Sequence, residues 1–334
     1  MIDPCALPKA ELHVHIEGTF EPAQIFEFAE RNNVTLNYPN VAALEDAYKF
    51  TDLQSFLNVY YAAMAALISE RDFEELTLSY LRRAKAQGVK HAEIFFDPQA
   101  HLDRGLSFDT VINGMWAALR RSEGDFGITT ALIMCFLRDK SENSAMQTLE
   151  LALPHRERII GVGLDSAELG NPPSKFKGVF DRARAEGFLT VAHAGEEGPP
   201  DYVWEALELL KVSRVDHGVR SMEDPKLVQH LAATQIPLTV CPLSNVRLRV
   251  VDRMQDHPLK RMVDAGLRVT VNSDDPAYFG GYVADNYAAV FEPLKLTDND
   301  VILFARNSFE ASFIADEAKR KFIASLDEAL AAAP

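Results

Sequence analysis

The chain has 334 residues, of which 47% are hydrophobic and 25% are charged, and its formal net charge is −15. This composition is ordinary for a soluble globular protein, and the lack of any apolar run of about 18 residues excludes a membrane-spanning helix. The negative charge disfavours nucleic acids and polyanionic substrates as partners, because phosphates are bound mainly by Lys and Arg, and it favours a small neutral substrate.

The N-terminal segment and the cysteines favour a cytoplasmic location. The opening residues MIDPCALPKAELHVH lack the basic and apolar regions of a secretory signal. Cys5, Cys135 and Cys241 are scattered and odd in number, which suits reduced thiols better than a disulfide framework. We therefore expect a cytoplasmic protein.

Short apolar runs alternate with helical patterns along the chain. The predicted strands, in chain order, are 10–16, 90–97, 128–136, 158–165, 188–194, 213–218, 237–241 and 268–274. Helical stretches separate them, and those at 72–88, 174–187 and 258–266 end in Gly, a common helix stop. Eight strand–helix repeats predict a single (β/α)₈ TIM barrel domain over residues 1–334. An open doubly wound sheet is the alternative, but no G-x-G-x-x-G follows the first strand, as a dinucleotide-binding sheet would need.

Two segments exceed a minimal barrel. An insertion at about 20–70 follows the first strand and is predicted to be helical, with an aromatic cluster at Phe50, Phe56, Tyr60 and Tyr61. Extra packing explains most of these rings, and a cap over the mouth of the barrel is the functional interpretation. The residues after the eighth strand are predicted to form the last barrel helix and terminal helices.

Polar residues collect where the predicted strands end, which is the end of a barrel that carries active sites. They are His13, His15 and Glu17 after the first strand, Asp165 and Glu168 after the fourth, His193 and Glu196 after the fifth, Asp216 and His217 after the sixth, Asn245 after the seventh, and Asp274 and Asp275 after the eighth. Taken singly, each has a structural explanation, such as a buried histidine or a turn aspartate.

Taken together, the strand-end residues favour metal-assisted hydrolysis. Three histidines and one carboxylate suit a borderline-soft divalent metal with an open position for water. Zinc lowers the pKa of bound water to about 7, which makes a nucleophile available at neutral pH. Glu196 follows His193 closely enough to donate or accept a proton in the same site, and His217 could orient or deprotonate the water.

The segments LPKAELHVHIEGT, TVAHAGEEG, RVDHGVRS, CPLSNVRLRV and VTVNSDDP resemble, in order and spacing, the motifs of the adenosine/adenine deaminase family, a branch of the amidohydrolase barrels. The resemblance runs from residue 7 to about residue 276. It implies one zinc ion per chain and attack of water at C6 of a purine, with loss of ammonia. The implied zinc ligands are His13, His15, His193 and Asp274. The resemblance further implies that Glu196 protonates the ring nitrogen beside C6, that His217 holds the attacking hydroxide, and that Asp275 binds the imidazole-ring nitrogen of the purine.

Three departures from the adenosine deaminase pattern resemble the branch that acts on the free base. Glu17 stands where a ribose-contacting Asp is usual, Glu168 stands where a Gly is usual, and residues 244–248 read SNVRL. The resemblance therefore implies adenine as the substrate, hypoxanthine and ammonia as products, and a role in purine salvage. Glu17 and Glu168 are expected to bind the substrate by filling the ribose space and accepting a base N–H. A solvated carboxylate at the rim is the alternative for Glu17.

Other functions remain open at this point. An adenosine deaminase, or a deaminase of N6-substituted adenines, would use the same residues. A non-catalytic purine-binding protein on a decayed barrel is a different class, and the intact set of metal-binding and proton-transfer residues disfavours it. The unrelated cytidine-type zinc deaminases need H-x-E and C-x-x-C, and the chain has the first at residues 91–93 but nowhere the second. The expected partner is a small purine base, with no nucleic acid and no membrane.

Overall fold

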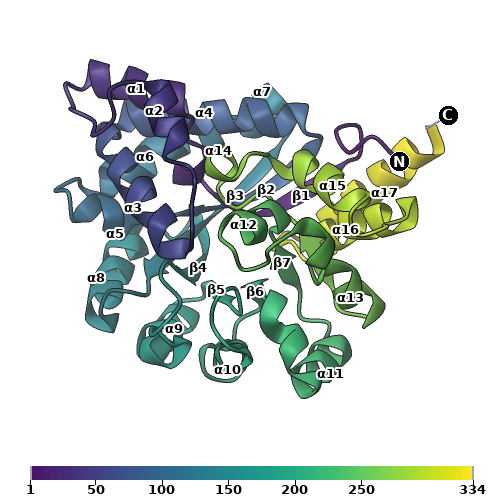
Figure 1. The fold of residues 1–334 in the computed structure, drawn as a ribbon. Helices are drawn as coiled ribbons and strands as arrows, with labels where there is room; N and C mark the ends of the chain where they lie inside the picture. The colour runs from purple at the N-terminus through teal and green to yellow at the C-terminus, as the bar shows by residue number, and fades with distance from the viewer. Residues whose placement is uncertain (1, 333–334) are drawn as a thin grey trace.

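A computed structural model describes residues 2–332 and shows a barrel of parallel strands surrounded by helices (Figure 1). Within this range eight strands stand in chain order, each hydrogen-bonded in parallel to the next. They are β1 (Lys9–His15), β2 (Val89–Phe96), β3 (Thr129–Leu137), β4 (Ile159–Asp165), β5 (Leu189–Ala194), β6 (Arg214–His217), β7 (Leu238–Val240) and β8 (Val269–Val271).

The circle closes between the last strand and the first. The amide of His15 donates to the carbonyl of Asp274, and the amide of Asp274 donates to the carbonyl of His13, each over 3.0 Å. The predicted (β/α)₈ barrel is therefore confirmed. The expected strand at 268–274 is shorter in the structure, because the chain leaves the ladder before Asp274, whose φ of 65° is left-handed.

One helix covers the outside of the barrel after each strand. These helices are α4 (Glu70–Ala86), α6 (Phe108–Leu119), α8 (Glu142–Ala152), α9 (Lys177–Ala185), α10 (Pro200–Glu205), α11 (Pro225–Thr234), α13 (Leu259–Asp264) and α16 (Asp298–Glu310). Shorter or additional helices are α5 (Pro98–Leu102), α7 (Ser122–Phe126), α12 (Pro242–Arg247), α14 (Pro276–Phe279), α15 (Val283–Phe291) and the terminal α17 (Asp316–Ala332). None of the helices within residues 2–332 combines the length and apolar character needed to cross a bilayer.

Helix α4 illustrates why these segments fold as they do. A capping box between Ser69 and Asp72 satisfies backbone donors at its start, and Gly88, with φ +79°, turns the chain towards β2 just past its end. Phe73 and Tyr80 recur on one face and are fully buried. Burying a side chain such as Phe73 stabilises the fold by about 1.5–3 kcal/mol, so the amphipathic pattern fixes which face meets the barrel.

The insertion after β1 forms α1 (Pro22–Arg31), α2 (Val41–Asp46) and α3 (Leu53–Ala63), inside the predicted 20–70 segment. This purple to blue segment lies at the upper left of Figure 1. Phe56 of α3 packs against Phe279 of α14, with ring centroids 4.7 Å apart. The contact ties α3 to the segment that follows β8, so α3 covers the mouth of the barrel.

Candidate metal centre and active site

The strand ends aim polar side chains at the barrel axis. His13 and His15 alternate with apolar residues on β1 and share its inner face. His217 ends β6, and Asp274 lies three residues past the end of β8; their φ angles are positive, at 62° and 65°. Such backbone costs a residue other than glycine about 1–3 kcal/mol and is concentrated at functional sites. The chain thus turns sharply at two of the residues whose side chains enter the centre.

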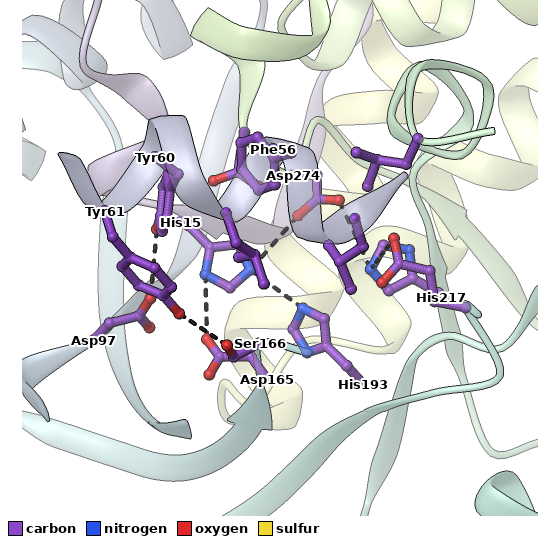
Figure 2. A pocket seen from close by; sticks show the side chains of 15 residues that line it. His15, Phe56, Tyr60, Tyr61, Asp97, Asp165, Ser166, His193, His217 and Asp274 are labelled. Atoms are coloured by element: carbon purple, nitrogen blue, oxygen red, sulfur yellow. Dashed lines mark hydrogen bonds and ion pairs between the residues drawn. The ribbon is translucent and has the colours of Figure 1, made fainter. Parts of the chain in front are cut away.

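Three histidines and one aspartate form a compact cluster of donor atoms. The Oδ1 atom of Asp274 lies 3.2 Å from His13 Nε2 and 3.5 Å from His15 Nε2. His15 Nε2 lies 3.2 Å from His193 Nε2 (Figure 2). Ligand atoms about 2.1 Å from a tetrahedral metal are about 3.4 Å apart, so these separations fit a zinc ion. His13 Nε2 is buried and has no hydrogen-bond partner among the described residues, as expected of an atom reserved for a metal.

His217 borders the same cluster from the other side of the carboxylate. Its Nε2 lies 3.7 Å from Oδ2 of Asp274, the oxygen that does not face His13 and His15. Ligand atoms of His13, His193, His217 and Asp274 all lie within 4.8 Å of one another, so His217 could also reach a metal. The distances nevertheless favour His15 as a ligand, because it faces both Asp274 Oδ1 and His193 at closer range.

The protonation states of the cluster suit metal binding. Burial lowers the pKa of His15 to about 3 and lowers the pKa of His193 well below its usual value. Burial opposes ionisation of Asp274, but the surrounding histidines, His13 first, lower its pKa well below the ordinary value. Neutral imidazoles and an ionised carboxylate are the forms that bind a metal.

Two further aspartates lie behind these histidines. Asp216 Oδ2 lies 3.6 Å from Nδ1 of His193, and Asp165 Oδ2 lies 3.6 Å from Nδ1 of His15. Carboxylates that hydrogen-bond to this nitrogen hold the ring orientation and tautomer of metal-binding histidines. Sequence reasoning placed both aspartates at strand ends but gave them no role.

Glu196 places a buried carboxyl group at the edge of the cluster. Its Oε1 is 3.7 Å from His217 Nε2, and its side chain is buried. Burial, together with the negative charges of Asp274 and Glu168, raises the pKa of Glu196 well above its ordinary value. A carboxyl group that keeps its proton at neutral pH can serve as a general acid.

A hydrogen-bond chain assigns the tautomer of His217. The backbone N–H of Leu259 donates to His257 Nδ1 over 3.1 Å, so the proton of neutral His257 lies on Nε2, 3.1 Å from Asn245 Oδ1. The Asn245 amide nitrogen then donates to His217 Nδ1 over 3.4 Å. Burial lowers the pKa of His217 to about 3, so the ring is neutral and carries its proton on Nε2, facing Asp274. Sequence reasoning missed His257 and assigned Asn245 no role.

Asp275 lies beside the cluster, with a carboxylate oxygen within 4.8 Å of donor atoms of His15 and Asp274. Its Oδ1 is buried and has no partner within residues 2–332. Burial and the neighbouring charge of Asp274 raise the pKa of Asp275 well above its ordinary value. Gly18 makes room for this side chain, because a Cβ at residue 18 would overlap Asp275 Oδ1. Asp275 lines the pocket, and its raised pKa favours the protonated form of its carboxyl group.

Helix α3 closes the pocket over these residues. Leu53, Phe56 and Leu57 contribute apolar side chains, and Figure 2 shows α3 crossing the pocket above the histidines. Tyr61 donates a hydrogen bond of 2.9 Å to Ser166 Oγ, and Tyr60 donates one of 3.4 Å to an oxygen of Asp97. Most of the aromatic cluster thus serves the pocket as well as the packing that was expected of it.

Comparison with known proteins agrees with the geometry of the site. The model of the adenosine deaminase family matches residues 8–329. The chain belongs to the adenosine deaminase family. The resemblance inferred from the five sequence motifs is therefore confirmed.

Family members of known structure and sequence resemble the chain over nearly its whole length. An adenine deaminase from Streptomyces coelicolor is 59% identical over 96% of this chain and 95% of that protein. The crystal structure of an adenine deaminase from Arthrobacter aurescens has a TM-score of 0.96 at 53% identity and covers 98% of this chain and 100% of its own. An amidohydrolase from Burkholderia ambifaria, crystallised with bound zinc, has a TM-score of 0.89 at 28% identity and covers 98% of this chain and 92% of its own.

Glu17, one of the departures from the adenosine deaminase pattern, lies behind the pocket wall. Its Oε1 accepts hydrogen bonds from the amide of Asp97 over 3.2 Å and from His101 Nε2 over 2.9 Å. The side chain is only 1% exposed, which contradicts a solvated position at the rim. Glu17 is not among the residues that line the pocket, whereas Asp97 is. The geometry thus gives Glu17 an indirect part in shaping the site.

Glu168, the second departure, points away from the space expected for the base. Its carboxylate accepts backbone hydrogen bonds of 2.7–3.1 Å from residues 195–198. It does not line the pocket among the described residues. The expected contact with the substrate does not fit this geometry, because both carboxylate oxygens are already taken.

Proposed function

We propose that the protein is a zinc-dependent adenine deaminase, which converts adenine and water into hypoxanthine and ammonia in purine salvage. The observation that carries the proposal is one covered pocket that holds a three-histidine, one-carboxylate cluster together with the buried carboxyl groups of Glu196 and Asp275. Relatives named adenine deaminase, 53–59% identical to this chain over nearly its full length, support the choice of substrate.

His13, His15, His193 and Asp274 would hold the zinc ion, one per chain. His15, His193 and Asp274 also line the pocket, so a zinc ion held by these donors would be accessible to water and substrate there. Zinc bound there would supply a water molecule acidic enough to act as a nucleophile near neutral pH.

The remaining side chains bind the purine and move its proton. Glu196 donates its proton to N1 of the ring, which draws electrons away from C6 as the oxygen of water attacks there. His217, with its proton on Nε2, donates a hydrogen bond that orients the attacking oxygen. Asp275 donates a hydrogen bond from its carboxyl group to N7. One proton of the attacking water passes to the exocyclic amino group, which leaves C6 as ammonia, and the other restores the carboxyl group of Glu196.

Asp97 offers the pocket an acceptor for a base that carries its own N–H. It lines the pocket near His15, and its Oδ1 is buried without a partner in the described part of the chain. Glu17 holds the amide of Asp97 in place from behind. Adenine has an N–H at N9, or at N3 in a minor tautomer, whereas ribose occupies N9 in adenosine. Burial raises the pKa of Asp97 to about 7, so near and above neutral pH its ionised form can accept this N–H in a charge-assisted hydrogen bond that only the free base can make.

Adenine is expected to be the preferred substrate, with kcat/KM at least ~10²-fold above adenosine. The nucleoside brings a ribose under α3 and leaves Asp97 without its donor, and an unsatisfied buried acceptor is costly. Ammonia release from adenine, adenosine and N6-methyladenine, measured in parallel, tests this. Asp97→Asn should reduce the ratio of kcat/KM for adenine to kcat/KM for adenosine, because it lowers activity on adenine. Comparable efficiency on adenine and adenosine in the unmodified protein would instead indicate an adenosine deaminase.

Replacing Asp274 and replacing Asp275 are expected to have different effects on zinc content and on kinetics. Asp275→Ala should keep the zinc but raise KM and lower kcat, because the purine loses its N7 partner while the four donors of the cluster remain. Asp274→Ala should lose zinc, since it removes the oxygen that faces His13 and His15. Metal analysis and steady-state kinetics on both variants separate the two roles. Loss of zinc from Asp275→Ala alone would mean that the roles are reversed.

A further inference from the structure

A single buried carboxylate, that of Glu168, accepts the backbone amides of the loop that carries Glu196. Glu168 Oε1 accepts a hydrogen bond of 2.8 Å from the amide of Gly195. Its Oε2 accepts from the amides of Glu196, Glu197 and Gly198 at 3.1, 2.8 and 2.7 Å. A carboxylate offers about four acceptor positions, and consecutive backbone N–H groups that converge in this way form an anion-binding nest. The acceptor capacity of Glu168 is therefore used by the loop.

The loop depends on this carboxylate because it has no regular secondary structure of its own. It leaves β5 after Ala194 and reaches α10 only at Pro200. Gly195, with φ +69°, turns the backbone sharply, so the amides that follow point to one side. Buried amides without an acceptor would be costly, and the ionised carboxylate forms stronger hydrogen bonds with them than a neutral acceptor would.

Arg138 ties the nest to the metal centre. Its Nη1 lies 4.0 Å from Glu168 Oε1 and donates a hydrogen bond of 2.6 Å to the carbonyl of His193. The guanidinium thus connects the carboxylate that holds the loop with the backbone of a proposed zinc ligand. Because the ion pair and the nest are buried, little of this network is free to shift.

We propose that Glu168 is a positioning residue: it fixes the backbone of residues 195–198 so that the carboxyl group of Glu196 is held where it meets the purine ring. The proposal rests on the proposed function, in which Glu196 delivers the proton. Glu168 touches neither the base nor the zinc ligands' side chains and acts through Glu196. A misplacement of about 1 Å in a reacting group can cost ~10²-fold in rate, so the expected effect is on kcat.

Glu168→Gln in the zinc-loaded protein tests the role. The change turns one acceptor oxygen into an NH₂ group, which would face backbone N–H groups as another donor. We expect kcat for adenine to fall by ~10²-fold with zinc content unchanged and KM within ~3-fold. Hydrogen exchange of the peptide containing residues 195–198 should rise, while exchange in β5 stays as in the unmodified protein.

A double-mutant cycle with Glu196→Gln separates positioning from general destabilisation. Once Glu196 can no longer give a proton, adding Glu168→Gln should lower the residual kcat by less than ~3-fold, because the two residues act as a unit. Asp72→Asn is the matched control: Asp72 is also buried and accepts from the amides of Ile68 and Ser69 at 3.0 and 2.8 Å, remote from the pocket. It should lower Tm yet leave kcat within ~2-fold.

Gly198→Ala disturbs the nest by changing the loop instead of the carboxylate. It tests the positioning role of Glu168 if the Glu168→Gln variant does not fold. A Cβ at Gly198 would lie 2.5 Å from Glu168 Oε1, which displaces the carboxylate while every ionisable group is kept. This variant should also lower kcat with zinc retained and with faster exchange in residues 195–198.

The outcomes separate the positioning role from the function itself. Unchanged kcat in Glu168→Gln, or in Gly198→Ala when that variant has to decide, would overturn the positioning role. An equal fold loss of kcat from Glu168→Gln in the unmodified and the Glu196→Gln backgrounds would also overturn the positioning role. Failure of the unmodified protein to release ammonia from adenine, or full activity of Glu196→Gln alone, would overturn the proposed function and the positioning role with it. Those reference measurements are made before Glu168 is changed.

Discussion

Replacing His13 or His193 by alanine is expected to remove the zinc and abolish measurable deamination. Each supplies one of four donors to the cluster, and three remaining donors hold a metal far more weakly than four. Even changes to residues behind metal ligands cost 10–100-fold in affinity or activity, so loss of a ligand should cost more. Metal analysis should find about one zinc per chain in the unmodified protein and only a small fraction of that in either variant. Full zinc occupancy in both variants would refute the ligand assignment.

Two further variants sharpen this test. His15→Ala should lose zinc and His217→Ala should keep it, because His15 Nε2 lies 3.2 Å from His193 Nε2 whereas His217 Nε2 faces the other oxygen of Asp274. Loss of zinc from His217→Ala but not from His15→Ala would mean that His217, and not His15, is the zinc ligand. His155→Ala is the control, since His155 is half-buried and bonded to Asp109 over 2.8 Å, outside the cluster. It should retain both zinc and turnover.

The barrel could be predicted from the sequence because parallel strands buried on both faces produce short apolar runs. The run predicted at 213–218 corresponds to β6 at Arg214–His217, and the other strands begin within one residue of their predicted starts. The convergence of His13, His193 and Asp274 was also predictable. All strands of a (β/α)₈ barrel end on the same side, so residues at those ends meet whatever their separation in sequence.

The direction taken by long side chains was not predictable in the same way. Glu17 and Glu168 were placed at strand ends correctly, but a Glu has three rotatable bonds and can turn towards the axis or back into the wall. Glu168 turns towards the amides of a loop 27–30 residues further along the chain. No local pattern in the sequence indicates that those amides need an acceptor. The role of Glu168 as the acceptor for the loop could therefore not be predicted.

Residues that act through another residue were missed for a related reason. Asn245 and His257 set the tautomer of His217 through a chain of hydrogen bonds, yet each has an ordinary structural explanation in its own segment. Thr239, which lies 2.9 Å from His13 Nδ1 and donates to Asp216 over 2.8 Å, is simply one polar residue in a short strand. Their roles depend on which atoms meet in space, and strand-end position alone carries no such information.

Glu196→Gln is expected to keep zinc and purine binding but to lose turnover by ~10²–10⁴-fold, the usual contribution of a general acid. Glutamine preserves the shape and the hydrogen-bond donor of a protonated carboxyl group, so the ring nitrogen keeps a partner, but an amide cannot deliver a proton. Zinc analysis, titration with hypoxanthine and the rate of ammonia release measure the three properties separately. Near-normal turnover would remove Glu196 from the mechanism.

Glu197→Gln is the matched control, because it makes the same chemical change one residue further along the loop. The Glu197 carboxylate faces the amide of Leu53 at 3.4 Å instead of the metal cluster, so its loss should change kcat by less than ~3-fold.

The pH dependence of the activity offers an independent check on Glu196. Burial and nearby carboxylates raise the pKa of Glu196, and a general acid works only while protonated. Activity of the unmodified protein should therefore persist above the ordinary titration range of a glutamate and fall as pH rises through the raised pKa. In Glu196→Gln that alkaline decline should be absent from the residual rate, since the group that loses the proton is gone.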